Sequence, residues 1–524
     1  MIPGINSFML NNYSIEEIFA FSSKIGCRYV SVQIEHLYEK NLISLANQYH
    51  IMINAAGSLF LDVDDFSESL SRGKEIVDLC AYHRIHMLVV VINSKCEGYE
   101  WMKNAVIMLR QLCEYAEVNQ IMIALEPLSN EMRMVTCLTH MHSANIICDY
   151  VERDNIGIVV DTFHCGDMEN IWFELETMDD AKIVGIHLSD KDAFGNACFP
   201  GEGKLPLEKM LQVSNKLAKG CITELEIVNQ RLVKDSITDL SKFRNAFLQF
   251  SRITVVGELA IHLYEDENGN EQRTTLGGGA GMIAGQLSCL SDFPHLIGIC
   301  GEDYWGSRIR DAYAEYSGWV DIVQQKGGES SVVTICGDNI SINAGNIEVA
   351  NLKRVLNDIG NNNQYCYLPM FPGYESIYQN LVNKKNIRLM CDFGFYEWCG
   401  KLEILSEKIS SSDGGYCALL NVRGMSKEEK KTLLNHTKAK GYTYAIATDG
   451  NNEVLFADKD CVLTYPVFTA ERIESTCGAG DCMMAGILHF LNKGYSIEDA
   501  ISFGILVAYK KVQTTGFWER TRGR

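Results

Sequence analysis

The chain has 524 residues, 47% of them hydrophobic and 22% charged, and is therefore long enough for two or more globular cores. Its net charge of −20 argues against nucleic acid or an anionic membrane as a partner, because both repel an acidic surface. No apolar run is long enough to span a bilayer. The net charge does not exclude small phosphorylated ligands, since backbone amides and single cations are enough to bind them.

The cysteines predict a reducing compartment. They number 19, none forms a CxxC pair, and many lie inside apolar runs, such as Cys80, Cys113, Cys300 and Cys391. The first residues, MIPGINSFML, lack the basic region and cleavage site of a secretory signal. We therefore expect a cytoplasmic protein with reduced thiols.

Residues 1 to about 247 alternate short apolar runs with amphipathic helix patterns such as 104–117. Eight strands that alternate with helices are the pattern of a (β/α)8 TIM barrel. The expected strands are 3–9, 29–34, 51–55, 86–92, 121–125, 156–160, 183–188 and 221–228.

Acidic residues and one histidine close four successive runs of this half. They are Glu126 in IMIALEP, Asp161 in IGIVVDTFH, His187 in KIVGIHLSD and Glu226 in CITELEIV. Successive members are about one strand-plus-helix unit apart, so we expect them at the same level on neighbouring strands. Carboxylates with one imidazole favour a Mn²⁺, Co²⁺ or Mg²⁺ site at the mouth of the barrel.

The fourth ligand of this site has two candidates. Glu224 and Glu226 point to the same side of an extended strand, so either can contribute. We favour Glu226, because the apolar pair Ile227 and Val228 follows it as a strand end should. For any one of these acids, a helix N-cap or a solvated loop position is the simpler explanation; the order of four at consecutive strand ends favours the metal site.

Such a site suits chemistry next to a ketose carbonyl. A divalent ion acidifies the neighbouring C–H bond and stabilises the negative charge that follows proton removal. Glu126 and Glu226 lie on different strands, so one can remove the proton and the other return it.

The pattern changes at Ser251. RITVVGELAIHLY predicts one strong strand, and the glycine cluster at 277–281 opens a helix. Polar alternating stretches between them and at 330–342 are typical of a small antiparallel lid, and the remaining strands alternate with helices. We expect a doubly wound α/β domain with a small β lid.

The two halves predict two domains, 1–248 and 251–520. No Pro/Gly/Ser-rich linker lies between them, so we expect the domains to pack against each other.

The segment STCGAGD, residues 475–481, precedes an apolar helix pattern. Glycines and a helix N-terminus together favour binding of a phosphoryl group by the amides of Gly478, Ala479 and Gly480. Asp481 can accept the proton of a sugar hydroxyl and free it for in-line attack on the γ-phosphate of ATP. A four-letter motif alone also occurs where a glycine-rich helix start serves only as a cap.

The first half resembles the xylose-isomerase-like barrel family, and within it the ketose 3-epimerases. VVDTFH at 159–164 is similar to the strand-six motif of that family, which implies Asp161 as a metal ligand and His164 as a substrate-binding residue. LCEYAE with ALEPL (112–128) and PGEGKLPL (200–207) look like fructoselysine 3-epimerase, which implies that Glu202 lies near the substrate. Ala193 replaces the arginine that sugar epimerases of this kind carry six residues after the histidine ligand.

The second half resembles the ribokinase-like (PfkB) carbohydrate kinases, in GGGAGMIA (277–284), GICGEDYWG (298–306) and STCGAGDCMMAG. DFGFYEW (392–398) and KKVQTTGFW (510–518) look specifically like fructoselysine 6-kinase. The resemblance implies that His262 and Gly278 bind the sugar. It also implies that Thr448 and Gly450 bind the nucleotide.

Four positions depart from the kinase pattern. His262 replaces the first-strand aspartate, and Met282 replaces the asparagine of the glycine-rich signature; both are sugar contacts in the family. Ser475 replaces the aspartate that opens the GAGD motif, and Glu453 replaces the second glycine of the nucleotide turn. The catalytic loop is therefore intact, whereas the acceptor pocket is altered.

These features predict a bifunctional enzyme. We expect the barrel to epimerise or isomerise a ketosamine of the psicoselysine/fructoselysine type, and the kinase to phosphorylate it at the 6-hydroxyl with Mg²⁺-ATP. Two alternatives stay open: a generic ketose isomerase joined to another sugar kinase, and a carbohydrate sensor with an inactive kinase half. The sequence does not determine which sugar or which metal the protein binds, or whether intermediates pass between the sites. It also leaves the oligomeric state open, and a homo-oligomer is possible.

Overall fold

The computed structural model of the protein forms two compact units, Met1–Phe247 and Leu248–Arg524. The structure describes residues 1–95, 100–132, 136–165, 171, 174–175, 182–211, 221–266, 268–313, 316–336, 339–356, 359, 364–384, 386–459, 461–514 and 516–517. Residues 515 and 518 of the KKVQTTGFW motif and the predicted domain limit at 520 lie outside these ranges.

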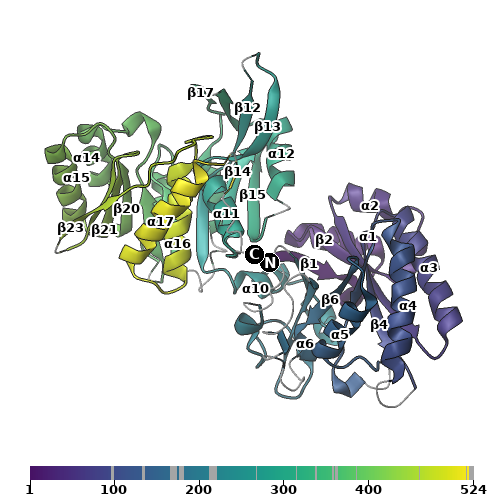
Figure 1. Cartoon of the computed structure of the whole chain (residues 1–524). Coiled ribbons are helices and arrows are strands. Elements are labelled where there is room, and N and C mark those ends of the chain that lie inside the picture. Colours follow the sequence, from purple (N-terminus) through teal and green to yellow (C-terminus); the bar gives the residue numbers. More distant parts are fainter. Residues whose placement is uncertain are drawn as a thin grey trace. The chain divides into compact units, whose positions relative to one another are not determined.

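The first unit is a closed barrel of eight parallel strands, as predicted (Figure 1). Around the barrel the strands follow the order β1-β10-β7-β6-β5-β4-β3-β2. Their bounds are β1 (Ile2–Asn6), β2 (Tyr29–Gln33), β3 (Met52–Asp62), β4 (Met87–Asn93), β5 (Met122–Leu125), β6 (Ile156–Asp161), β7 (Ile183–Leu188) and β10 (Ile222–Leu225). Helices that cover the barrel include α1 (Ile15–Ile25), α2 (Leu42–Gln48), α3 (Phe66–Tyr82), α4 (Glu100–Glu117), α5 (Met141–Val151) and α10 (Leu240–Leu248).

Local sequence explains where these helices begin and which face they bury. Helix α1 starts at Ser14, whose hydroxyl and amide exchange hydrogen bonds with Glu17, and it ends at Gly26 in the left-handed conformation. In α4 the apolar residues, spaced three and four apart, form a buried stripe against the barrel.

The strand register brings the predicted ligands to one level. Asp161 on β6 pairs with His187 on β7, and His187 pairs with Glu224 on β10. The prediction that the last strand reaches residue 228 is wrong, because β10 ends at Leu225. The amide of Glu226 still donates a hydrogen bond to the Leu188 carbonyl, at 3.1 Å, so the chain stays beside β7 for one more residue.

The second unit is a doubly wound α/β domain. Its nine-stranded sheet has the order β15-β14-β11-β18-β19-β20-β21-β22-β23 and is parallel except at β22 and β23. The bounds are β11 (Ile253–Glu258), β14 (His295–Gly301), β15 (Trp319–Gln325), β18 (Tyr365–Pro369), β19 (Arg388–Asp392), β20 (Gly415–Asn421), β21 (Tyr442–Thr448), β22 (Glu453–Ala457) and β23 (Val462–Pro466).

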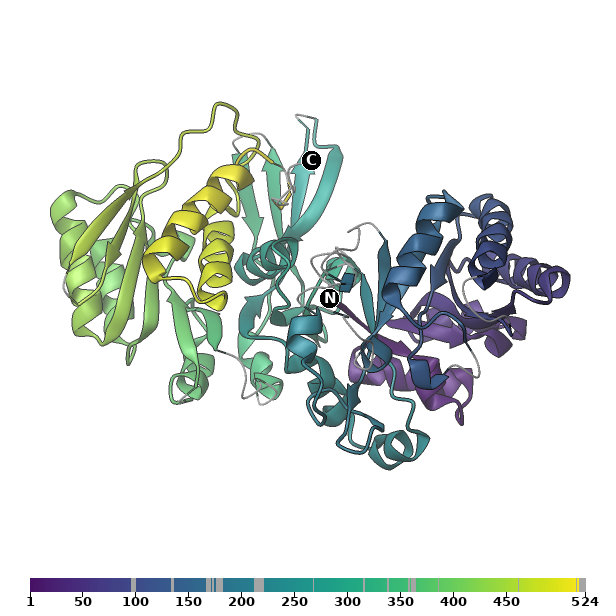
Figure 2. The same ribbon diagram turned by 60° about the horizontal axis from the view of Figure 1, so that its bottom comes forward.

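Separate hydrophobic cores fill the two faces of this sheet. One face is covered by α11 (Gly279–Cys289), α16 (Ala479–Asn492) and α17 (Ile497–Lys511), and α16 and α17 lie side by side in both views (Figures 1 and 2). The other face is covered by α13 (Glu375–Leu381), α14 (Leu402–Ser410) and α15 (Lys427–Ala439).

The lid differs from the prediction in two respects. RITVVGELAIHLY forms two strands, because the chain leaves the main sheet after β11 and enters the lid as β12 (Ala260–Glu265). The lid sheet has the order β13-β12-β16-β17 and is not purely antiparallel, since β12 and β16 run parallel. Its other strands are β13 (Glu271–Gly277), β16 (Ser331–Cys336) and β17 (Asn339–Asn343).

Two expectations concern the chain as a whole. Within the described ranges, no helix combines the length and apolarity needed to cross a bilayer. The cysteines that the structure describes are all free thiols.

Candidate functional site

The four residues favoured as metal ligands meet at the barrel. One donor atom from each of Glu126, Asp161, His187 and Glu226 lies within 4.8 Å of the other three. His187 Nδ1 is 2.7 Å from Glu126 Oε1 and 2.6 Å from Glu226 Oε2. The first three side chains are buried and Glu226 is partly buried, so the group forms a pocket of oxygen donors around one imidazole.

The electrostatics of this group favour a cation at its centre. Burial lowers the pKa of His187, but Glu226 and Glu126 outweigh this effect and raise it well above the usual value. Burial raises the pKa of Glu226, and the charges of Glu126 and Asp161 add to the rise. Three carboxylates this close repel one another, and a divalent ion among them would relieve that repulsion. The residues present therefore fit a divalent metal.

Glu224 lies on the other side of the imidazole. Its Oε2 is 3.6 Å from His187 Nε2, and its Oε1 accepts hydrogen bonds from Ser31 (2.5 Å) and Asn54 (3.0 Å). Burial raises the pKa of Glu224 to about 7. Glu224 thus contacts the back of His187, whereas Glu226 shares the Nδ1 side with Glu126.

Polar residues that were not among the predicted site residues hold the carboxylates in place. Asn6 Nδ2 donates to Glu226 Oε2 at 3.2 Å, and Ser58 Oγ donates to Glu126 Oε2 at 3.1 Å. These residues, like Ser31 and Asn54, are polar positions within otherwise apolar strand runs. A polar residue that points into a barrel needs a hydrogen-bond partner, so these positions could have been predicted to contact the carboxylates.

Two predicted substrate residues have different surroundings. His164 is in the short helix α6 (Thr162–Cys165) that follows β6; it is buried, and its Nδ1 lies 3.4 Å from Ser129 Oγ. Glu202 pairs with Lys242 Nζ on α10 at 3.0 Å, and no described contact joins it to the four-residue group. The loop that carries Glu202 is shaped by Asp190, which accepts the amides of Gly201, Gly203 and Leu205 at 3.0, 3.1 and 3.0 Å.

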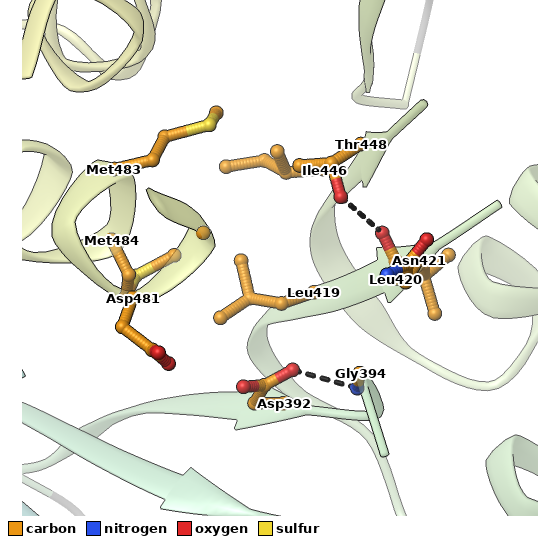
Figure 3. Close-up of a pocket in the computed structure, with 11 residues that line it drawn as sticks. Asp392, Gly394, Leu419, Leu420, Asn421, Ile446, Thr448, Asp481, Met483 and Met484 are labelled. Carbon is orange, nitrogen blue, oxygen red and sulfur yellow. Dashed lines mark hydrogen bonds between the residues drawn. The ribbon is translucent and has the colours of Figure 1, made fainter. Parts of the chain in front are cut away.

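In the second unit, Asp481 lies in the first turn of α16, after Gly478, which adopts the left-handed conformation with φ of 76°. A cavity of about 200 Å³ opens beside it, and Thr448 and Gly480 also line this cavity (Figure 3). Gly450, Gly478 and Ala479 do not line it. The predicted base and part of the nucleotide turn, far apart in sequence, thus face one space.

Two further residues surround Asp481. Tyr367 Oη donates to Asp392 Oδ2 at 2.6 Å, and Asp392 faces Asp481 in the cavity (Figure 3). Burial and the charge of Asp392 raise the pKa of Asp481 to about 7, although Lys511 lowers it. A carboxyl group that titrates near neutrality is suited to accept a proton there. Asp392 opens the motif DFGFYEW, and Lys511 belongs to the motif KKVQTTGFW. The sequence did not indicate that either residue lies near Asp481.

The altered acceptor residues border the GAGD turn. His262 on β12 is buried, with Cys477 Sγ 3.8 Å from its Nδ1. Burial, together with the charge of Lys511, lowers the pKa of His262 to about 4, so its imidazole is neutral at neutral pH. A Cβ on Gly478 would lie 2.3 Å from Met282 Cε, which places Met282 against the turn. Gly278, with φ of 73°, is the N-cap of α11.

The turn predicted to bind the nucleotide is anchored to α15. Lys430 Nζ lies 2.6 Å from Asp449 Oδ2 and 3.0 Å from Glu453 Oε1. Glu453, which replaces a family glycine, therefore pairs with a lysine behind the turn.

Known proteins match both halves. The family model described as xylose isomerase-like TIM barrel matches residues 19–242, and the pfkB family carbohydrate kinase model matches residues 417–519. An inosose isomerase of Bacillus velezensis is 24% identical over 247 residues, 43% of this chain and 87% of that protein. A 1-phosphofructokinase of Haloferax volcanii is 36% identical over 78 residues, 15% of this chain and 25% of that protein.

Among solved structures, ribokinase from Giardia lamblia aligns with a TM-score of 0.43 and 17% identity, over 51% of this chain and 94% of that one. The first family match agrees with the closed barrel of the first unit. The second match agrees with the doubly wound sheet and lid of the second unit. This chain therefore joins a xylose isomerase-like TIM barrel to a pfkB family carbohydrate kinase domain.

Proposed function

We propose that the protein is a bifunctional enzyme that acts on a ketosamine of the psicoselysine/fructoselysine type. The barrel interconverts two such sugars, and the second unit phosphorylates the product at its 6-hydroxyl with Mg²⁺-ATP. The observation that carries the proposal is the convergence of Glu126, Asp161, His187 and Glu226 in a chain that also places Asp481 on a cavity.

In the barrel, the four converging residues would hold a Mn²⁺, Co²⁺ or Mg²⁺ ion, which polarises the ketose carbonyl when bound. Glu226 is the fourth ligand in this proposal, because it shares the Nδ1 side of His187 with Glu126. One of these two glutamates removes the proton from the carbon beside the carbonyl, and the other returns a proton to the opposite face. His164 and Glu202 bind the substrate.

In the kinase, Asp481 accepts the proton of the sugar hydroxyl. The hydroxyl oxygen then bonds to the γ-phosphorus as the bond to the bridging β–γ oxygen breaks, and ADP leaves. The amides of Gly478, Ala479 and Gly480 bind the charge of the transferring group at the start of α16. Thr448 and Gly450 bind the nucleotide, and His262 and Gly278 border the sugar.

A broader pairing is the second candidate: a ketose isomerase with another sugar kinase. The names of the relatives, inosose isomerase and 1-phosphofructokinase, favour it, because neither refers to an amine-bearing sugar.

Mass spectrometry with ATP, metal and a panel of sugars tests the proposal. Wild-type protein is expected to convert both psicoselysine and fructoselysine to one phosphorylated product. Glu126→Gln should phosphorylate fructoselysine only, and Asp481→Asn should interconvert the two sugars without phosphorylation. Preference for fructose or another plain ketose would support the broader pairing. Absence of phosphoryl transfer to every sugar would support a sensor.

A further inference from the structure

Two groups of opposite charge, which come from distant parts of the chain, act on Asp481. We propose that Asp392 and Lys511 are positioning residues of the phosphoryl-transfer site, which act on Asp481 from β19 and from the end of α17. The proposal rests on the kinase function proposed above.

Asp392 is fixed in place by its own partners. Its Oδ2 accepts the Tyr367 hydroxyl at 2.6 Å, and its Oδ1 accepts the Gly394 amide at 2.7 Å. Asp392 and Asp481 line the same cavity, where their carboxyl groups face each other (Figure 3). Tyr367 lies beside both, since a Cβ on Gly279 would be 3.1 Å from Asp481 Oδ1 and 3.2 Å from Tyr367 Oη. Burial raises the pKa of Asp392, whereas its hydrogen bonds with Tyr367 and Gly394 lower it. When it is ionised, Asp392 presents a negative charge to Asp481 from a fixed position.

Lys511 supplies the opposite charge. Its side chain is 1% exposed, at the end of α17, which packs along α16, the helix whose first turn contains Asp481. Its Nζ donates to the Thr514 carbonyl at 3.3 Å, and this carbonyl is a neutral partner. Burial lowers the pKa of Lys511, whereas Cys482, Cys477 and Asp481 raise it. A buried cation favours negative charge nearby. Lys511 accordingly lowers the pKa of Asp481, which lies in the first turn of the neighbouring helix α16.

The other groups around Asp481 are neutral near pH 7. Burial raises the pKa of Tyr367 well above its usual value and that of Cys477 to about 11. Burial also raises the pKa of the Cys482 thiol. Arg273, on the lid strand β13, is charged and lowers the pKa of Lys511. Burial raises the pKa of Asp481, and the charges of Asp392 and Lys511 shift it further in opposite directions.

The sign of each effect can be predicted. A base must be ionised, so activity falls as the pH drops through the pKa of Asp481. Removing the cation destabilises the carboxylate, and Lys511→Met should move the acidic limb of the kcat/KM profile to higher pH. Removing the repelling charge, as in Asp392→Asn, should move that limb to lower pH. Each shift is expected to be about one pH unit.

The experiment records this profile for phosphorylation of fructoselysine by the full-length protein. Lys511→Arg should retain the wild-type limb, and Lys510→Met, at the neighbouring partly exposed lysine, serves as the matched control. Carboxyl-¹³C NMR of aspartate-labelled protein, assigned with Asp481→Asn, follows the same titration without any substrate. If Lys511→Met does not fold, the shift of the Asp481 titration in Asp392→Asn tests the proposal by itself.

Opposite shifts of the Asp481 titration in the two variants would support the proposal. Shifts in the same direction, or none, would overturn it. Opposite shifts by NMR in a protein that phosphorylates no sugar would instead overturn the kinase function and leave the role of the two residues intact.

Discussion

His187 shows how a single side chain organises the barrel. Its Nδ1 faces Glu126 and Glu226, and its Nε2 faces Glu224. An imidazole with a carboxylate behind it is the arrangement by which a metal-binding histidine is oriented. The same carboxylates repel one another when ionised, so a bound divalent ion would stabilise the site together with the histidine.

We predict that the purified protein contains one divalent ion in the barrel. Glu126→Gln and His187→Ala should each lose it, because each removes one of four converging donors. Glu117→Gln, at an exposed glutamate at the end of α4, is the control and should retain the ion. Elemental analysis measures the metal content. Equal metal in all three variants would show that the ion, if present, lies elsewhere.

His262 and Met282 predict the acceptor preference of the kinase. Methionine offers no hydrogen-bond donor, and a neutral, buried histidine has a different geometry from aspartate. Fructose and ribose should therefore be poor acceptors, since a site discriminates against hydroxyls that it cannot bond. His262→Asp with Met282→Asn should raise kcat/KM for fructose and lower it for fructoselysine. If the wild-type kcat/KM for fructose already equals that for fructoselysine, and the double variant changes neither value, the acceptor pocket is assigned wrongly.

Helix α15 supports the nucleotide turn, and the start of that helix can be weakened by one change. Ser426 Oγ accepts the Glu429 amide at 3.3 Å, and Glu429 accepts the Ser426 amide at 2.7 Å. Ser426→Ala removes this cap, which is expected to destabilise the first turn by about 1 kcal/mol. Amide hydrogen exchange in that turn should accelerate about fivefold.

The matched control for the cap is Thr432→Ala, at an exposed position inside the same helix. It should slow exchange slightly or leave it unchanged, because alanine has the higher helix propensity. Equal exchange in both variants would mean that the cap does not limit the stability of α15.

At the scale of the whole molecule, the two units have separate cores. The barrel closes on itself, and the kinase sheet has its own hydrophobic core on each face. Asp481→Asn should therefore lower phosphorylation by roughly 10²-fold or more and leave epimerisation at the wild-type rate. Separate assays of the two reactions measure this. A parallel loss of epimerisation would show that the units are coupled.

Hydrophobic patterning by itself determined the number and order of the barrel strands. All eight apolar runs became strands, because alternation of short buried strands with amphipathic helices has few compact solutions. The same pattern brought Glu126, Asp161 and His187 together, since consecutive parallel strands end at one edge of the barrel. Glycine chemistry likewise predicted the turn before Asp481, where Gly478 has positive φ.

Tertiary structure alone decided features that depend on residues distant in sequence. Strand periodicity treated Glu224 and Glu226 as equivalent. In the structure β10 ends at Leu225, and the two glutamates approach opposite nitrogens of the His187 ring. RITVVGELAIHLY divides between two sheets because β14, β18 and β16 provide different pairing edges. Asp392, Asp481 and Lys511 meet only once the sheet and its helices have assembled. Local patterns carry no information about such meetings, because burial and charge proximity arise from packing between separate elements.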